Sequence, residues 1–342
     1  MKVAVVLFNL GGPDGPEAVR PFLFNLFNDP AIIRAPGLFR SLIAGRIAKS
    51  REMSARVNYD RMGGRSPILP ETQAQADALE RRLADLGSDV RVFIGMRYWR
   101  PFMEDTAREV AAFEPDEIVL LPLYPQFSTT TTASSLKAWN TGYRGGGRAR
   151  AICCYPQTEA FAAAHAKAIE DAWTQAGKPA KVRLLFSAHG LPQRVVDAGD
   201  PYQAQVEATA SAVAERLGGG WDWTVCYQSR VGPLKWIGPS TLDCIDQAAR
   251  DGLGVVISPI AFVSEHLETL VELDHDYAEA ARAAGCSPYI RVPALGIDAG
   301  FVETLAQAVE AALERAPGVE TISGGRWCAA GFAGCPVERK RA

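Results

Sequence analysis

Three glutamates and a histidine recur at the spacing of one helix face. The segment PIAFVSEHLETLVELDHD, residues 259–276, places Glu265, Glu268, Glu272 and His275 at offsets of 0, 3, 7 and 10. At about 100° per residue these offsets form one stripe on an α-helix, opposite its apolar side. Neighbouring carboxylates repel one another, so such a stripe is typical either of a face in water or of a path for protons or cations.

A second histidine lies where it could face this stripe. His189 follows the apolar run 182–187, and the acidic segment follows a similar run at 255–260. Because parallel strands end at the same edge of a sheet, His189 and the carboxylates can converge. An imidazole facing carboxylates can accept protons near neutral pH or bind a divalent metal. A histidine by itself is more often structural, so this chemistry depends on the elements around it.

The composition is that of a globular protein without signs of nucleic-acid binding. With 342 residues and 48% hydrophobic content, the chain can bury a large core and favours two domains. A net charge of −3 gives no reason to expect nucleic acid. The first apolar run breaks at Asn9, too early for a signal peptide, and no later window is apolar enough to span a membrane. We therefore expect a cytoplasmic protein with reduced cysteines.

Apolar runs alternate with helical patterns along the chain. Eight runs bounded by turn residues predict strands at 3–10, 90–95, 118–124, 149–155, 182–187, 223–227, 255–260 and 289–292. Helical periodicity lies between many of them, at 70–86, 159–175, 203–217 and 242–251. Continuously apolar strands alternating with helices predict parallel sheets covered on both faces, which is an α/β fold.

Three strand-end motifs recur in the same order in both halves. LFNLGGP, VFIGMRYWRPF and VLLPLYPQFS of the first half match LFSAHGLP, TVCYQSRVGPL and VVISPIAFVS of the second. Because ligands bind beyond the carboxyl ends of parallel strands, the repeat predicts two similar Rossmann-like domains with the active-site cleft between them. We place these domains at 1–157, joined by a C-terminal helix at about 298–315, and at 158–297, followed by a tail at 316–342.

Seven motifs, in order along most of the chain, resemble the ferrochelatase family. They are NLGGP at 9–13, YDRMGGRSPI at 59–68, MRYWRPF at 96–102, LPLYPQFSTTT at 121–131, SAHGLP at 187–192, QSRVGPLKWIGP at 228–239 and SEHLETLVELD at 264–274. The resemblance implies a chelatase-like fold and insertion of Fe²⁺ into protoporphyrin IX, the last step of haem synthesis. Two pyrrole protons leave as the metal enters, so the reaction needs a base and a metal route.

The resemblance also implies roles for the acidic segment. His189 is our candidate for the base and iron contact, with Glu268 its partner across the macrocycle. Glu265, His266 and Glu272 would form the adjoining proton or metal path. His266 lies off the stripe of an ideal α-helix, so it fits the site only if the helix starts irregularly or is wound as a π-turn.

Six further residues match family positions that hold the porphyrin. Aromatic rings could form flat walls, and a guanidinium and hydroxyls suit the propionates. The pocket residues implied are Arg97, Tyr98 and Trp236, and the propionate contacts are Arg51, Tyr59 and Ser66. Singly, each aromatic could equally be core and each polar residue solvated surface.

The segment 37–51 is a candidate for peripheral membrane contact. Its apolar residues have helical spacing with basic residues nearby, and it belongs to the segment, about 20–66, that matches the family's lip over the pocket mouth. Packing against the domain is the alternative. The sequence leaves the oligomeric state open.

The cysteines depart from the family pattern. Cluster-bearing relatives hold a [2Fe–2S] centre with C-terminal cysteines and one more cysteine from the body of the chain. The tail of this chain has only Cys328 and Cys335. Cys153 and Cys154 are candidates for the remaining cluster ligands. Neighbouring cysteines in a strand point to opposite faces, so we expect one of that pair to be buried and the other available. The alternative is that these four cysteines are free thiols. We expect the other three cysteines, Cys226, Cys244 and Cys286, to pack as small apolar residues.

Other functions remain open at this point. The same residues could insert iron into coproporphyrin III or cobalt into sirohydrochlorin. A non-catalytic haem or porphyrin carrier would need ring walls and propionate contacts but no acidic path. A nucleotide-binding protein is the weakest alternative, because the glycine-rich turns lack the G-x-G-x-x-G spacing.

Overall fold

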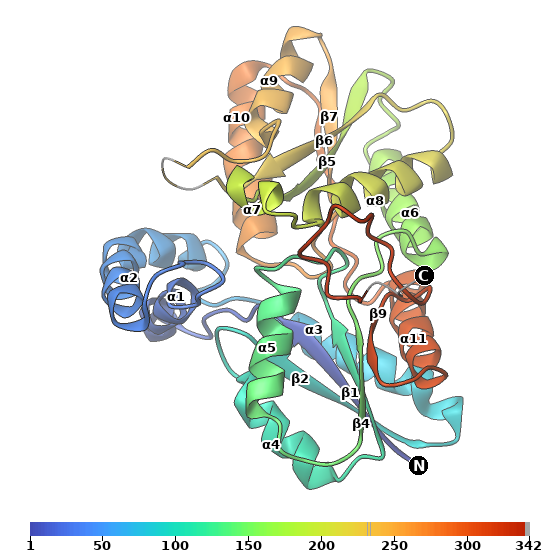
Figure 1. The fold of residues 1–342 in the computed structure, drawn as a ribbon. Coiled ribbons are helices and arrows are strands. Elements are labelled where there is room, and N and C mark those ends of the chain that lie inside the picture. The colour runs from blue at the N-terminus through green and yellow to red at the C-terminus, as the bar shows by residue number, and fades with distance from the viewer. Residues whose placement is uncertain (231, 233, 339–342) are drawn as a thin grey trace. The chain divides into compact units, whose positions relative to one another are not determined.

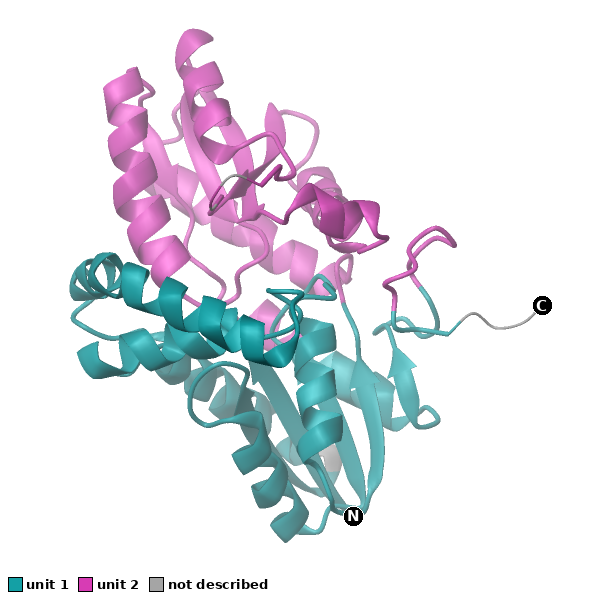
Figure 2. Cartoon of the chain, turned by 60° about the vertical axis from the view of Figure 1, so that its left-hand side comes forward, with its two compact units in different colours: residues 1–154, 305–326, 336–342 teal, residues 155–304, 327–335 magenta. Residues whose placement is uncertain are grey.

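The computed structural model, which describes residues 1–230, 232 and 234–338, contains two parallel sheets (Figure 1). The chain divides into two units, each built around one sheet (Figure 2). Unit 1 comprises 1–154, 305–326 and 336–342, and unit 2 comprises 155–304 and 327–335. Residues 339–342, the end of the predicted tail, lie outside the described residues.

The sheet of unit 1 has five strands in the order β2-β1-β3-β4-β9. Its strands are β1 (Lys2–Asn9), β2 (Asp89–Met96), β3 (Glu117–Pro122), β4 (Arg148–Ile152) and β9 (Gly318–Glu320). The central strands β1 and β3 are buried along their length, apart from Lys2 at the start of β1, because helices cover both faces, which explains their continuously apolar sequence. The strand β9 was not predicted, and it pairs with β4 from inside the segment interpreted as a tail.

Helices connect the strands of unit 1. They are η1 (Pro16–Ala18), α1 (Val19–Phe27), α2 (Gly37–Asp60), α3 (Ile68–Leu83), η2 (Ala84–Leu86), α4 (Met103–Phe113), α5 (Thr132–Gly142) and most of α11 (Ala299–Leu313). The helices α4 and α5 pack on one face through Val110 and Trp139. Among the described helices, none combines the length and apolar character needed to cross a bilayer.

The sheet of unit 2 has the order β6-β5-β7-β8. Its strands are β5 (Val182–His189), β6 (Trp223–Gln228), β7 (Gly254–Pro259) and β8 (Tyr289–Arg291). Successive residues of β5 belong to different cores: Phe186 packs with α6 (Glu159–Gln175) and α8 (Tyr202–Arg216), whereas Leu185 packs with α9 (Thr241–Arg250) and α10 (Ala278–Ala284). Figure 1 shows these two helix pairs on opposite faces of the sheet. The short helix α7 (Gln193–Asp197) follows β5.

The predicted α/β fold is confirmed, and the eight predicted strands are present. The first three strands of each unit in chain order carry the repeated motifs, and they take the same places in their sheets: β2-β1-β3 in unit 1 and β6-β5-β7 in unit 2. The sequence repeat therefore corresponds to a repeat of topology.

The acidic segment differs from its prediction in winding. Residues Glu268–Tyr277 form the π-helix η3, in which hydrogen bonds run from residue i to i+5, and α10 continues it. Glu265 and His266 precede this helix rather than lying on it, and His275 is exposed. The predicted α-helical stripe of four residues is therefore wrong, while the π-turn that His266 required is present.

Candidate active site

Two strand ends of unit 2 bring the first site residues together. His189 ends β5 and pairs in register with Gln228, which ends β6. Gln228 is buried, and its amide oxygen accepts a hydrogen bond from Ser187 Oγ at 2.8 Å. This fixes the amide so that Nε2 donates to the backbone oxygen of Glu268 at 2.9 Å. The end of β6 thereby holds the first turn of η3 beside His189.

His189 and Glu268 form a direct pair. The distance from His189 Nδ1 to Glu268 Oε2 is 2.7 Å, and the side chains are 39% and 18% exposed. Burial by itself would lower the pKa of His189, but the charge and hydrogen bond of Glu268 outweigh it, so that pKa is raised. Burial would likewise raise the pKa of Glu268, but His189 lowers it to about 2. Both shifts favour a charged imidazolium-carboxylate pair.

A serine that the sequence analysis did not select joins this pair to the next carboxylate. Ser229 Oγ lies 3.0 Å from Glu268 Oε2 and 2.6 Å from Glu272 Oε2. Its backbone has a φ of 64°, a left-handed conformation that costs a non-glycine residue roughly 1–2 kcal/mol. The only signal in the sequence was its place inside the motif QSRVGPLKWIGP.

Glu272 has a different protonation preference from Glu268. Burial and the neighbouring charge of Glu268 raise the pKa of Glu272 to about 7, although Ser229 and Gln228 donate toward it. A carboxyl group with this pKa can take up and release a proton near neutral pH. Glu268 and Glu272 thus have opposite pKa shifts although both are carboxylates on one helix.

Glu265 does not face this cluster with a free carboxylate. Its Oε1 accepts from Arg291 Nη1 at 2.5 Å and from the backbone N–H of Ala294 at 2.9 Å. Burial by itself would raise the pKa of Glu265, but the charge of Arg291 and the hydrogen bonds to the carboxylate outweigh burial. The pKa of Glu265 is therefore below its ordinary value. The carboxylate is therefore held ionised and paired.

His266 is buried next to the acidic cluster. Its ring packs against Phe262 in a tilted arrangement, with the centroids 4.7 Å apart and 55° between the planes, and Nδ1 has no hydrogen-bond partner among the described residues. Burial lowers the pKa of His266 despite the nearby charges of Glu268 and Glu265. A neutral imidazole with an unused nitrogen is suited to accept a proton or a metal.

Trp236 packs against the turn that follows His189. A Cβ atom on Gly190 would lie 3.3 Å from the indole Cε3 and 3.0 Å from the carbonyl oxygen of Gln228. Only glycine lets the indole approach this backbone so closely. The predicted ring wall and the predicted base are thus neighbours in unit 2.

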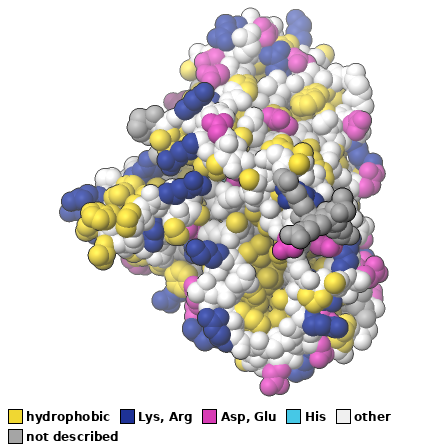
Figure 3. Space-filling view, viewed as in Figure 1, with side chains coloured by type: hydrophobic (Ala, Val, Ile, Leu, Met, Phe, Trp, Pro, Cys, Tyr) yellow, Lys and Arg dark blue, Asp and Glu magenta, His cyan; other side chains and the backbone are white. Residues whose placement is uncertain are grey.

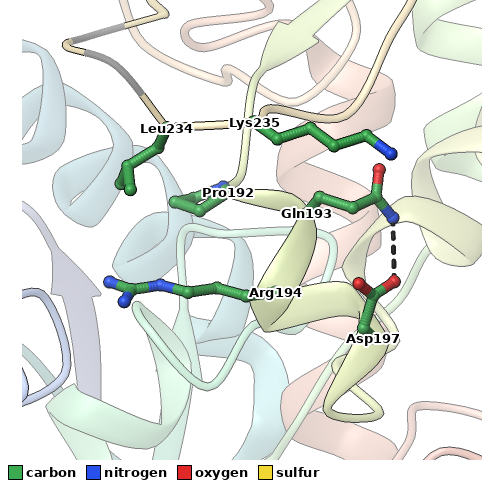
Figure 4. Close-up of a pocket in the computed structure, with 6 residues that line it drawn as sticks. All are labelled: Pro192, Gln193, Arg194, Asp197, Leu234 and Lys235. Carbon is green, nitrogen blue, oxygen red and sulfur yellow. Dashed lines mark hydrogen bonds between the residues drawn. The ribbon is translucent and has the colours of Figure 1, made fainter.

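A small cavity lies beyond this turn. It has a volume of about 240 Å³ and is lined by Pro192, Gln193, Arg194, Asp197, Leu234 and Lys235. Figure 4 shows the Arg194 and Lys235 side chains extending in opposite directions, and Gln193 hydrogen-bonded to Asp197. Ligand pockets span roughly 300–1,000 Å³, so this cavity is too small for a porphyrin.

Unit 1 holds the other pocket residues in a polar cluster around Asp29. Asp29 Oδ2 accepts from Arg97 Nη2 at 2.7 Å, Tyr98 Oη at 2.9 Å and Ser134 Oγ at 2.5 Å. Arg97 Nε also donates to Ser134 Oγ at 2.7 Å. Tyr98 is only 2% exposed, and burial together with Asp29 raises its pKa. Neither Asp29 nor Ser134 was selected from the sequence.

The predicted propionate contacts lie at the two ends of a loop and on α2. Arg51 lies over the ring of Phe27, with 5.5 Å between its guanidinium carbon and the centroid. Tyr59 is buried near the end of α2, and Ser66 is buried just before α3, where its Oγ accepts from the N–H of Ile68.

The cysteines differ from one prediction. Cys153 and Cys154 follow the end of β4, both are buried, and their Sγ atoms lie 3.3 Å apart. The expectation that one is buried and one available is wrong, because the pair lies beyond the regular strand and its alternation. Cys328 accepts from Gln205 Nε2 at 3.4 Å in unit 2, where Cys335 also lies. Cys226, Cys244 and Cys286 pack in one apolar core, as predicted.

Known proteins resemble the chain along nearly its whole length. A sequence model described as Ferrochelatase matches residues 2–313. A protein named ferrochelatase from Phenylobacterium zucineum is 62% identical over 317 residues, covering 92% of each chain. Another from Caulobacter vibrioides is 60% identical over 337 residues, covering 98% of this chain and 97% of that protein.

Solved structures with a similar fold include two chelatase-like proteins. The sirohydrochlorin chelatase SirB from Bacillus subtilis subspecies spizizenii, in complex with cobalt, has a TM-score of 0.52 at 10% identity, covering 92% of this chain and 96% of that one. DR2241 from Deinococcus radiodurans, a multi-domain protein with structural similarity to chelatases, has a TM-score of 0.51 at 18% identity, covering 89% of this chain and 54% of that one. At these identities the likeness shows the fold alone.

Proposed function

The chain belongs to the ferrochelatase family, and we propose that it inserts Fe²⁺ into protoporphyrin IX to form haem. The observation that carries this proposal for the site is the contact of His189 with Glu268 at 2.7 Å, at the carboxyl end of a parallel sheet. Insertion removes two pyrrole N–H protons, so it needs a base that can pass protons onward. A base paired with a carboxylate, and a second carboxyl group that titrates near pH 7, supply these requirements.

In this proposal His189 is the base and an iron contact. Its Nδ1 faces Glu268, so Nε2 is the atom left to accept a pyrrole proton or to contact the metal. The imidazolium formed by protonation is stabilised by the Glu268 carboxylate. The protein must therefore begin each turnover with His189 neutral, and because the pKa of His189 is raised, this neutral form becomes populated only at higher pH than for an ordinary histidine.

We assign Glu272 as the next proton acceptor, with His266 and Glu265 beside the route. Ser229 Oγ contacts both Glu268 and Glu272, so a proton can move between the two carboxylates through one hydroxyl. His266 has an unused Nδ1, and its ring lies near the charges of Glu268 and Glu265. The pairing of Glu265 with Arg291 supports a fixed negative charge rather than a proton carrier at that position.

For porphyrin binding we propose Trp236 as a ring wall and Arg97 as the positive contact. Arg97 uses Nε and Nη2 for Ser134 and Asp29, which fixes the plane of the guanidinium. Tyr98 would act by holding Asp29 rather than by offering a ring face, since it is buried. The propionate contacts remain those predicted, Arg51, Tyr59 and Ser66.

We also propose that α2 rests on an anionic membrane surface. Leu38, Phe39 and Leu42 are 85%, 65% and 59% exposed, and Figure 3 shows apolar side chains gathered over α2 with basic side chains beside them. Arg46 and Lys49 are exposed on the same helix. Such an apolar face flanked by cations is typical of helices that lie on anionic lipid.

Flotation with anionic liposomes tests this membrane contact. Wild-type protein should float with the vesicles at low salt, and Phe39→Ser should reduce its recovery severalfold. Leu242→Ser removes an exposed leucine from unit 2 and serves as the matched control. Absence of wild-type binding, or equal recovery of the two variants, contradicts the proposal.

A [2Fe–2S] cluster stays a prediction. Such a cluster takes four ligands. The described residues contain no group of three or more His, Cys, Asp or Glu side chains arranged to hold a metal. The proposed reaction has no step through a cluster.

Anaerobic metal insertion followed by absorbance tests the proposed function. The protein should insert Fe²⁺ or Zn²⁺ into protoporphyrin IX with turnover. The rates of iron insertion into coproporphyrin III and of cobalt insertion into sirohydrochlorin are measured under the same conditions for comparison. A faster rate with coproporphyrin III would reassign the substrate. Tight porphyrin binding without turnover with any metal would make the protein a carrier.

A further inference from the structure

Arg291 connects two separate parts of the acidic segment. Arg291 is the last residue of β8, and its Nε and Nη2 donate to the two carboxylate oxygens of Asp274 at 2.7 Å each. Its Nη1 donates to Glu265 Oε1 at 2.5 Å. The side chain is only 16% exposed. One guanidinium thus binds a residue before the π-helix η3 and a residue inside it.

Two further contacts join β8 and the residues after it to the same segment. Tyr289, two residues before Arg291 in β8, donates from its hydroxyl to the backbone oxygen of Leu273 at 2.7 Å. The N–H of Ala294 donates to the same Glu265 oxygen that Arg291 binds. The segment is therefore held from outside at its start and near its end.

A π-helix depends on such outside contacts. Its i to i+5 hydrogen bonds are rarely sustained over several turns, and most helical stability in proteins comes from tertiary packing. If η3 rewound as an α-helix, the angle between successive side chains would change; Glu268 and Glu272 would still share a face, but Glu268 would turn relative to Asp274, six residues later, which Arg291 binds. The winding therefore sets where Glu268 lies relative to the residue that Arg291 holds.

We propose that Arg291 is a positioning residue for metal insertion, which holds η3 in its π-winding by bridging Glu265 and Asp274 and so keeps Glu268 against His189. This inference rests on the proposed function. Arg291 touches neither His189 nor Glu268 in any contact that the structure describes, so it acts through the helix. A bidentate guanidinium-carboxylate pair is directional as well as strong, which suits fixing the register of a helix.

The proposal also explains why Glu265 and Asp274 are both acidic. Two carboxylates around one guanidinium satisfy its donors on two sides: Asp274 accepts through both of its oxygens and Glu265 accepts through Oε1. A lysine could neutralise charge here but could not bind Asp274 in the same forked geometry.

The test compares Arg291→Ala with a matched control, Arg183→Ala. Arg183 also bridges two aspartates of unit 2, Asp222 and Asp251, and it is 17% exposed, but it lies near the start of β5. We measure kcat and the porphyrin KM for zinc insertion, and amide hydrogen exchange over residues 264–277. Both variants are also assayed with methylguanidinium, which can occupy the space left by the guanidinium.

Arg291→Ala should lower kcat roughly 10- to 100-fold, since about 1 Å of misplacement at a reacting group can cost about a hundredfold. The porphyrin KM should change by no more than about twofold, and exchange over η3 should accelerate at least about tenfold. Methylguanidinium should restore kcat at least about threefold, and Arg291→Lys should fall between wild type and Arg291→Ala. Arg183→Ala should change kcat less than about twofold and should not respond to methylguanidinium.

If Arg291→Ala does not fold, Asp274→Asn replaces it, because this variant removes one carboxylate charge and leaves the pair with Glu265. It should lower kcat roughly three- to tenfold with faster exchange over η3. Normal kcat in the folded variants, or a loss equal to that of Arg183→Ala, overturns the proposal. A wild-type protein that inserts no metal would instead refute the proposed function, and the exchange measurement would still report whether Arg291 holds the helix.

Discussion

Replacing Glu272 with glutamine should stabilise unit 2 and at the same time impair the reaction. The wild-type carboxyl group is placed beside Glu268, and its pKa rises from an ordinary 4.5 to about 7. A raised carboxyl pKa means that the folded state holds the proton more tightly than the unfolded chain does. The folded state therefore loses stability as the pH rises from about 4.5 to about 7, and the loss persists above that range.

The expected magnitude follows from this difference in pKa. At about 1.4 kcal/mol for each pKa unit, wild type loses about 3 kcal/mol relative to a variant that cannot ionise. Glutamine has nearly the same shape and can still hydrogen-bond with Ser229. For a unit of this size each kcal/mol corresponds to roughly 2–4 °C in Tm. The Tm of Glu272→Gln minus the Tm of wild type should therefore be roughly 6–12 °C larger at pH 8 than at pH 4.5.

Calorimetric melting at several pH values between 4.5 and 8 measures this effect. Glu279→Gln, an exposed position on α10, is the control, and it should change stability by less than about 0.5 kcal/mol at any pH. A constant difference between Glu272→Gln and wild type across this range would refute the reasoning, because it would mean that Glu272 does not titrate in the native state where we place it.

The other predictions concern the base, its partner and the tail. His189→Ala should lower insertion at least about a hundredfold while porphyrin still quenches tryptophan fluorescence; near-normal turnover would pass the role of base to Glu268 and its neighbours. Glu268→Gln should lower turnover more than porphyrin affinity and should move the acidic limb of the kcat/KM profile to lower pH, because the charge that raises the pKa of His189 is gone; an unmoved limb would contradict the pairing. If a cluster is present, anaerobically purified protein should be red-brown with a reduced [2Fe–2S] EPR signal that Cys335→Ser abolishes, and colourless protein from iron-replete cells would leave the cysteines as free thiols.

The sheets could be predicted because their signal is local and repeated. Each central strand is buried on both faces, so it appears in the sequence as a continuous apolar run whatever its neighbours are. The strand β9 was missed because it has only three residues and pairs at the edge of the sheet. The order of the strands was not predicted; the repeat of motifs predicted only that the two sheets are built alike.

The winding of η3 could not be derived from its own residues. The spacing of Glu265, Glu268 and Glu272 is equally compatible with an α-helix, and the contacts that we propose hold the π-winding come from Gln228 and Arg291 on other strands. Only the misfit of His266 with an ideal α-helix indicated an irregular winding. The role of Arg291 was invisible for the same reason, since an arginine ending a short strand has no distinctive pattern.

Residues that hold other site residues were missed more often than the site residues themselves. Asp29 lies well before Arg97 in the sequence, and Ser229 lies far from Glu268, so no spacing connects either pair. Their connection exists only after the strands assemble. The prediction for Cys153 and Cys154 was wrong for a different reason. The alternation of side chains in a strand was applied to two residues that lie just past the end of β4.

Three features of unit 2 that violate local rules of folding lie in one place. Ser229 has a left-handed backbone, η3 has π-winding, and two carboxylates share a hydroxyl although one of them must then hold a proton. Each feature costs stability, and a chain selected for stability alone would lose all three. Their convergence around Glu268 and His189 is independent of any likeness to known proteins, and it favours a site in which proton transfer, and not only porphyrin binding, takes place.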